Sequence, residues 1–165
     1  GFMCNNSSEY KVVMQLKRCG FHISFAESCT GGLCAARLIS VPDASAVLDA
    51  SVITYSNQSK TDYLGVNPDT IERFGVVSEE VALEMAEGVS LKNNADVGVG
   101  VTGIAGPTGG SADKPVGTVC FGFKVREKTY AVTKHFSNID RNAVRNASAD
   151  YVFDELLRLI QHKMT

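Results

Sequence analysis

Residues 22–32 of the chain read HISFAESCTGG. The first part of this stretch alternates in a way typical of a buried strand, and the glycine-rich turn leads into a helical pattern from about Gly32 to Ile39. A second run of β-branched residues, Val47 to Tyr55, follows a connection around Pro42. Strands that alternate with helices in this way predict an α/β fold.

The rest of the chain continues this pattern and ends in a hairpin and a long helix. Capping residues and apolar periodicity predict further helices that open at Ser7, Ser56, Asn67, Ser78 and Asp140, and further strands at Val97–Thr102, Thr118–Val125 and Thr129–Phe136. Only residues 126–128 separate the last two strands, which is typical of a hairpin. The sequence therefore predicts a three-layer α/β/α single domain with a mixed, mostly parallel sheet.

The composition limits both the number of domains and the class of partner. The chain has 165 residues, 44% of them hydrophobic and 21% charged, which fits one globular domain. The net charge of −2 and the absence of a Lys/Arg block argue against nucleic-acid binding. No apolar run is long enough to span a membrane, and no signal peptide is visible, so we expect a cytoplasmic protein.

The expected domain spans residues 8–163. Gly1 and Phe2 precede Met3, so residues 1–7 are expected to be a tag remnant or a flexible N-terminus.

The cysteines and histidines show no metal-binding spacing. The five cysteines are odd in number and contain no C-x-x-C pair: Cys4, Cys19, Cys29, Cys34 and Cys120. The three histidines are scattered along the chain. We therefore expect free thiols in a reducing compartment, no metal and no cofactor.

Ser28 occupies the first candidate site, at the turn between the first strand and its helix. Open α/β folds bind ligands at the carboxyl end of their strands, and the amides that follow Ser28 belong to a helix N-terminus. Small residues would let a substrate approach the backbone. A glycine-rich turn with a capping serine or threonine has the same composition, so this segment alone leaves both interpretations open.

The second candidate is the glycine-rich loop Thr102–Gly110, which follows a buried strand. Four glycines and Pro107 favour an unusual backbone path with exposed amides, suited to an anion or an oxyanion. No G-K-[ST] follows, so the loop is not a Walker A motif. Gly98 and Gly100 resemble part of a dinucleotide-binding fingerprint, but they lie inside the strand.

Lys60 lies one helical turn beyond the second strand, and most lysines in such places are solvated. A buried lysine loses its proton more readily, and serine/lysine pairs are a known alternative to Ser-His-Asp in acyl transfer. His22, His135 and His162 offer no obvious third member of a triad. Lys60 is therefore a candidate general base.

Six segments together resemble the CinA C-terminal domain family, in order and at compatible spacing. They are Ala26–Gly32, Tyr55–Asn57 with Lys60, Gly75–Ser78, Thr102–Gly110, Lys114–Val119 and Asp140–Arg145. The resemblance covers about residues 8–160 and implies an α/β/α fold. It also implies the activity of that family's enzymes, which hydrolyse the carboxamide of nicotinamide mononucleotide to nicotinate mononucleotide and ammonia in pyridine nucleotide recycling.

The resemblance further implies roles for single residues. The implied catalytic residues are Ser28 as the nucleophile, Lys60 as the family's lysine and Arg141 as its arginine, with Arg145 as the fallback. We expect Arg141 to bind the phosphate, because a planar guanidinium binds it in bidentate fashion. The implied substrate-binding residues are Thr30, Gly31, Gly32, Tyr55, Asn57, Thr102, Gly103, Ala105, Gly106 and Arg145. The implied partner is the small-molecule substrate, and we also expect a homo-oligomer, a dimer or larger. The chain lacks the preceding domain of longer CinA proteins, so it is a stand-alone deamidase or a fragment.

Two other functions remain open at this point. One is an amidase with the same serine/lysine chemistry and another substrate, which ammonia release from the mononucleotide and from free nicotinamide would distinguish. The other is a non-catalytic nucleotide- or protein-binding module linked to the competence or DNA-damage response, which would bind without turnover.

Overall fold

The computed structural model describes residues 6–164 and shows five strands and six α-helices. In chain order the elements are α1 (Ser8–Cys19), β1 (Ile23–Glu27), α2 (Leu33–Ile39), a 3₁₀ turn (Ala44–Ala46), β2 (Val52–Ile53), α3 (Asn57–Leu64), α4 (Pro68–Phe74), α5 (Glu79–Lys92), β3 (Val97–Gly103), β4 (Thr118–Val125), β5 (Lys128–His135) and α6 (Arg141–Met164). Residues 1–5, on which part of the N-terminal expectation falls, lie outside the described residues, whereas the Ser7 hydroxyl caps α1.

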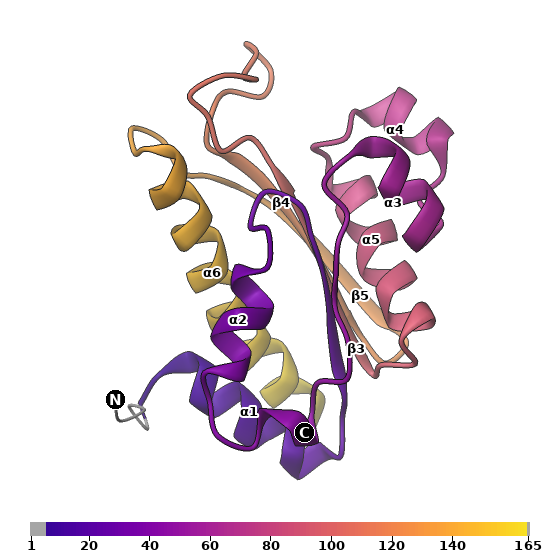
Figure 1. Ribbon diagram of the computed structural model, residues 1–165, viewed down its shortest axis with the longest axis vertical. Helices are drawn as coiled ribbons and strands as arrows, with labels where there is room; N and C mark the ends of the chain where they lie inside the picture. The colour runs from indigo at the N-terminus through magenta and orange to yellow at the C-terminus, as the bar shows by residue number, and fades with distance from the viewer. Residues whose placement is uncertain (1–5, 165) are drawn as a thin grey trace.

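The five strands form one mixed sheet in the order β2-β1-β3-β4-β5. β1 pairs in parallel with β2 and β3, and β4 is antiparallel to both its neighbours, so every strand except β4 runs in the same direction. Helices α1, α2 and α6 cover one face of the sheet and α3, α4 and α5 lie on the other (Figure 1). The predicted three-layer α/β/α fold is confirmed.

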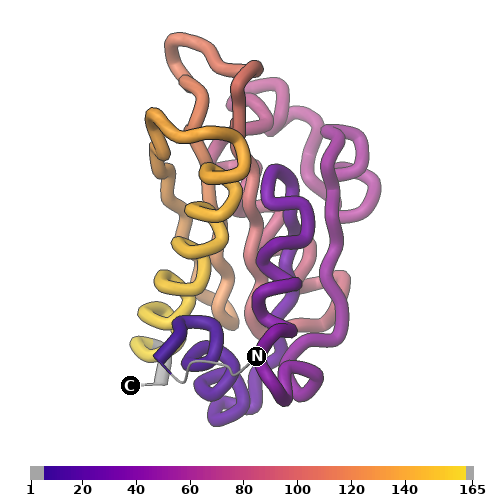
Figure 2. Tube along the Cα trace, turned by 60° about the vertical axis from the view of Figure 1, so that its left-hand side comes forward, coloured from indigo at the N-terminus to yellow at the C-terminus, as the bar shows by residue number. Residues whose placement is uncertain are grey.

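The loop between β3 and β4, the start of α6, and helices α3 and α4 gather at one end of the molecule (Figure 2). β1 and β3 point their carboxyl ends toward the same end, because they are parallel neighbours. Ser28, which directly follows β1, therefore faces these loops. This end of the sheet is where an open α/β fold places ligands.

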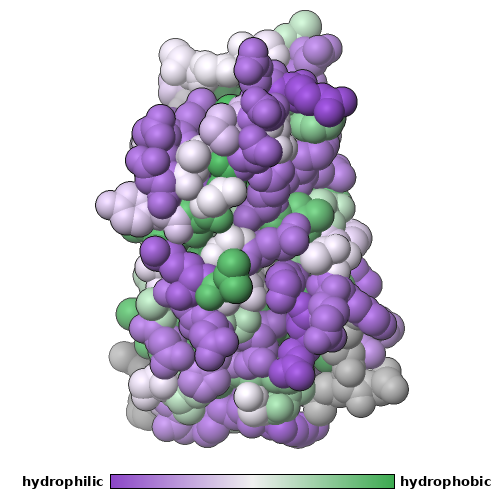
Figure 3. Space-filling view, turned by 90° about the vertical axis from the view of Figure 1, so that its right-hand side faces the viewer, coloured by the Kyte–Doolittle hydropathy of each residue, from purple (hydrophilic) through white to green (hydrophobic). Residues whose placement is uncertain are grey.

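The larger core lies between the sheet and the layer of α1, α2 and α6. Phe25 of β1 and Phe153 of α6 are both fully buried and their rings lie 6.1 Å apart. On the opposite side, the outward face of the α3–α5 layer is mainly hydrophilic (Figure 3). Both helical layers thus bury one face against the sheet, as amphipathic helices do.

Glycines in β3 and β4 explain how closely α5 packs on the sheet. A Cβ atom on Gly98 would lie 2.2 Å from the Ala86 carbonyl oxygen, and one on Gly100 would lie 2.2 Å from that of Ala82. Gly122 on β4 faces the Ala82 carbonyl in the same way, at 2.3 Å. The glycine interruption of β3 therefore serves helix packing.

The predicted strand Val47–Tyr55 is wrong in its extent, because only Val52–Ile53 pairs as β2. The chain upstream of β2 still runs beside β1, but side chains replace part of the ladder. The Phe25 amide donates to the Ser51 hydroxyl at 3.0 Å, where a regular strand would offer a backbone carbonyl. Because the Ser51 hydroxyl accepts the hydrogen bond in place of a backbone carbonyl, the regular ladder is interrupted there, while the chain still runs beside β1.

Several element boundaries also differ by one residue from the prediction, and two of these differences have a clear local cause. β5 begins at Lys128, because Arg126 adopts a positive φ of 57° and a two-residue turn suffices. α6 begins after Asp140, whose carboxylate accepts from the Ala143 amide at 2.8 Å and so caps the helix.

Substituting Gly100 by alanine tests the close packing of α5. The added Cβ has to displace the Ala82 carbonyl, so we expect Gly100→Ala to lower the free energy of unfolding by about 1–3 kcal/mol. Urea unfolding would measure the change, with Thr129→Ala on exposed β5 as the control. A Gly100→Ala protein as stable as this control would contradict the packing.

Candidate active site

Nine of the thirteen predicted site residues line one cavity of about 280 Å³. They are Ser28, Tyr55, Asn57, Lys60, Thr102, Gly103, Ala105, Gly106 and Arg141. The other four, Thr30, Gly31, Gly32 and Arg145, do not line it. The cavity lies where β1 and β3 end, so the sheet topology brings together segments that are far apart in sequence.

The end of β1 fixes Ser28 at the base of the cavity. Its amide donates to the Val101 carbonyl of β3 at 3.0 Å, which extends the parallel ladder by one residue. The side chain is 8% exposed. Ser28 is therefore held by backbone bonds while its hydroxyl remains at the cavity.

Lys60 reaches the same point from α3, although 32 residues separate it from Ser28. Its Nζ atom lies 3.0 Å from Ser28 Oγ, 2.7 Å from the Thr54 carbonyl oxygen and 3.3 Å from that of Tyr55. The side chain is only 1% exposed. A serine hydroxyl and a buried amine within hydrogen-bond distance have the geometry of a nucleophile and its base.

Burial also sets the charge of the lysine. It lowers the pKa of Lys60 from 10.5 to about 8, against a smaller opposite effect from Cys29. Within the described part of the chain, the hydrogen-bond partners of Nζ are one hydroxyl and two carbonyls, none of them a carboxylate. Because no counter-ion offsets the desolvation, the neutral amine is favoured.

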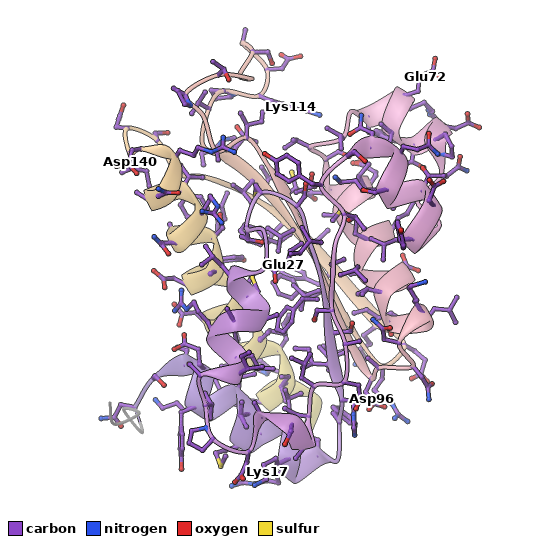
Figure 4. The ribbon with its side chains drawn as sticks, in the orientation of Figure 1. Lys17, Glu27, Glu72, Asp96, Lys114 and Asp140 are labelled. Carbon is purple, nitrogen blue, oxygen red and sulfur yellow. The ribbon has the colours of Figure 1, made fainter. Side chains whose placement is uncertain are left out.

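Glu27 is a buried residue directly before Ser28 whose structural role the sequence analysis missed. Its carboxylate is 1% exposed and accepts from the amides of Cys34 and Ala35, at 2.9 and 3.0 Å. It therefore caps the first turn of α2 from inside the molecule, between β1 and α2 (Figure 4). A carboxylate at the end of a strand of mainly apolar residues, shortly before a helix, was the available signal.

The two arginines of α6 take different places. Arg141 lines the cavity, where its Nη1 donates to the Gly106 carbonyl at 2.8 Å and its Nη2 donates to the Tyr55 hydroxyl at 3.1 Å. Arg145 lies one turn later and donates to backbone carbonyls of the turn that follows Ser28. Only Arg141 is at the cavity itself.

The glycine-rich loop forms the opposite wall. Gly106 adopts a positive φ of 83°, and a Cβ there would lie 2.3 Å from a methyl carbon of Val116. The Thr102 hydroxyl donates to the Val76 carbonyl at 3.0 Å, which holds the segment before α5 against the cavity. Val76 and Val77 line the cavity and were not predicted to do so, although their segment was among those that carry the family resemblance.

Cys29 also lines the cavity without having been predicted as a site residue. Burial raises the pKa of its thiol to about 12, so it remains protonated and is a weak nucleophile beside Ser28. Among the residues that the structure describes, no group of His, Cys, Asp and Glu side chains is arranged to hold a metal ion. No helix within residues 6–164 is long and apolar enough to cross a membrane.

Comparisons with known proteins show the family to which the chain belongs. Residues 5–160 match the model of the CinA C-terminal domain. The chain is 47% identical to a nicotinamide-nucleotide amidohydrolase PncC of Enterobacter agglomerans, over 87% of each chain. It is 46% identical to a CinA-like protein of Kosmotoga olearia, over 93% of this chain but only 37% of the relative, so it spans about a third of that protein's length.

A solved structure shows the same fold over nearly the whole chain. It is the competence/damage inducible protein CihA from Agrobacterium tumefaciens, which is 37% identical and superposes with a TM-score of 0.89, over 96% of this chain and 99% of that one. Together with the match over residues 5–160, this likeness shows that the chain belongs to the CinA C-terminal domain family.

Proposed function

We propose that this protein hydrolyses the carboxamide of nicotinamide mononucleotide, releasing nicotinate mononucleotide and ammonia. The observation that carries the proposal is the buried Lys60 Nζ at 3.0 Å from Ser28 Oγ, at the base of a cavity. The 47% identical relative that is named a nicotinamide-nucleotide amidohydrolase supports the choice of substrate. Acyl transfer by a serine/lysine pair supplies the chemistry.

The hydrogen bonds of Lys60 suit the neutral amine. A neutral amine has two N–H groups and one lone pair, and a carbonyl oxygen can only accept. When the amine is neutral, the carbonyls of Thr54 and Tyr55 can take its two N–H groups, which leaves the lone pair to accept the Ser28 hydroxyl proton. Lys60 is thus arranged to act as a general base.

The reaction then proceeds in two halves. Ser28 Oγ attacks the carboxamide carbon while its proton passes to Lys60. Lys60 gives that proton to the leaving nitrogen, the carbon–nitrogen bond breaks and ammonia leaves. Water attacks the resulting ester with Lys60 again as the base, which releases the acid and restores Ser28.

Arg141 is our candidate for the substrate phosphate, because a planar guanidinium binds phosphate through two parallel hydrogen bonds. It is exposed at the cavity, and its present partners are a carbonyl and a phenol, both neutral groups that a phosphate could replace. Asn57, Thr102 and Gly106 are the candidates for the ribose or the amide, and they line the same cavity.

Removing the nucleophile tests the proposed function directly. We expect the wild-type protein to release ammonia from nicotinamide mononucleotide, and Ser28→Ala to release none above background, because the acyl intermediate cannot form. A coupled ammonia assay measures both. Thermal melting serves as the control for folding, since a hydroxyl at a turn contributes little packing.

Two results would contradict the proposal. Wild-type protein that binds the mononucleotide without releasing ammonia would favour a binding module. A well-folded Ser28→Ala protein with near wild-type turnover would remove Ser28 as the nucleophile.

The base role of Lys60 predicts a specific pH dependence. Because only the neutral amine accepts the proton, kcat/KM should rise with pH through an apparent pKa near 8, with about a tenth of the enzyme active at pH 7. Lys60→Arg keeps the positive charge but does not give up its proton, so we expect at least about 1,000-fold lower kcat/KM. The measurement is a pH–rate profile of both proteins.

The alternative role for Lys60 is a fixed cation that stabilises charge on the substrate. In that case Lys60→Arg would remain within about tenfold of wild type, and the acidic limb of the profile would not depend on residue 60. Either result would exclude Lys60 as the base while leaving Ser28 as the nucleophile.

A further inference from the structure

All three nitrogen atoms of the Arg145 guanidinium donate hydrogen bonds within the protein. Its Nε donates to the Cys29 carbonyl at 2.9 Å and its Nη2 donates to the Thr30 carbonyl at 3.1 Å. Its Nη1 donates to the side chain of Asn142, on the same helix, at 3.0 Å. The side chain does not line the cavity. A guanidinium with these three hydrogen bonds has few N–H groups available to bind a substrate phosphate.

The two carbonyls that Arg145 binds belong to the turn directly after Ser28. In a trans peptide the C=O and the following N–H point in opposite directions. When Arg145 binds the Cys29 carbonyl, it therefore also directs the Thr30 amide away from the guanidinium. The same guanidinium also binds the Thr30 carbonyl. Rotation of either the Cys29–Thr30 or the Thr30–Gly31 peptide plane would therefore break a hydrogen bond to Arg145.

The backbone completes this arrangement. The Gly31 amide donates to the Ser28 carbonyl at 3.0 Å, which directs the Cys29 amide in the same way. Among the described residues, neither the Cys29 amide nor the Thr30 amide donates to a different residue. Of these two residues, Cys29 lines the cavity next to Ser28, whereas Thr30 is fully buried and does not line it. The Cys29 amide is therefore the one that can face a group bound beside the Ser28 hydroxyl.

Gly31 supplies the room that Arg145 needs. A Cβ on Gly31 would lie 3.3 Å from Arg145 Nη2, which is a tight contact, and the residue has a positive φ of 57°. A larger residue at position 31 would press on the guanidinium as well as strain the backbone. The position of the Arg145 guanidinium thus depends on the absence of a side chain at residue 31.

We infer that Arg145 is a positioning residue: by holding the Cys29 and Thr30 carbonyls, it fixes the turn that presents the Cys29 amide to the oxyanion formed when Ser28 attacks. The inference rests on the proposed function only in so far as Ser28 is the nucleophile. Donors fixed in advance stabilise the developing charge without reorganising during the reaction. Arg145 acts through the turn and does not itself touch the substrate.

Sulfonylation of Ser28 tests this role without any assumption about the substrate. Phenylmethanesulfonyl fluoride forms a bond from Ser28 Oγ to sulfur, the hydroxyl proton passes to Lys60 and fluoride leaves. A sulfonyl oxygen then occupies the oxyanion position. We expect Arg145→Ala to react at least about tenfold more slowly than wild type, followed by intact mass, since losing one such donor costs about 100- to 1,000-fold in rate.

Two controls accompany this measurement. Arg158→Ala removes another guanidinium of α6, one paired with Glu155, and should leave the rate of sulfonylation unchanged. Thermal melting shows whether Arg145→Ala is folded. If it is not, Gly31→Ala and Arg145→Lys disturb the same contact more gently and should each slow the reaction.

Steady-state kinetics separate positioning from phosphate binding. With nicotinamide mononucleotide, we expect Arg145→Ala to lower kcat about tenfold or more while KM stays within about threefold. With nicotinamide riboside, which lacks the phosphate, the fractional loss should be the same. Arg141→Ala should instead raise KM for the phosphorylated substrate and have little effect on the riboside.

Several results would overturn the inference: an unchanged rate of sulfonylation in folded Arg145→Ala, a KM effect confined to the phosphorylated substrate, or a wild-type Ser28 that does not react at all. If wild-type Ser28 reacts but the mononucleotide releases no ammonia, the proposed function fails, and the sulfonylation rates still decide the role of Arg145.

Discussion

The buried amine of Lys60 is the constraint on which the rest of the site depends. An ammonium with 1% exposure and no carboxylate partner would be costly to hold, so burial lowers its pKa from 10.5 to about 8. Between these two values the unfolded chain binds more protons than the folded one. Burial of Lys60 therefore lowers the free energy of unfolding by its full amount below about pH 8. This loss of stability becomes smaller as the pH rises and disappears above about pH 10.5. Under the proposed function, this loss of stability accompanies an amine that can act as a base near neutral pH.

The surrounding backbone is arranged to keep that amine in place. β2 ends at Ile53, and the carbonyls of Thr54 and Tyr55, the next two residues, accept from Lys60. The Thr54 amide donates to the Glu27 carbonyl at 2.9 Å, which connects the segment that holds Lys60 to the end of β1, directly before Ser28. The residues that directly follow β2 therefore help to place Lys60 beside Ser28.

Local chemistry explains which features the sequence could predict. Ser56 and Ser78 cap helices through bonds within one turn, Gly20 ends α1 with a positive φ, and Ser28 follows a strand that its own alternation reveals. The positions of Ser28 and Lys60 after two strands made them candidates for one site, and the family resemblance then implied their roles. The contacts of Arg145 cross 115 and 116 residues and depend on how α6 docks, so no local pattern contains them. The buried carboxylate of Glu27 likewise depends on the path of α2.

A direct titration of Lys60 tests the central claim most simply. NMR of the protein labelled with ¹³C at lysine Cε, with the resonance identified by its absence from Lys60→Arg, would follow the amine from about pH 6 to 11. The account predicts a pKa near 8, retained in Ser28→Ala because burial and not the hydroxyl is its main cause. A Lys60 that titrates near 10.5 would be a cation at neutral pH and would contradict its role as the base.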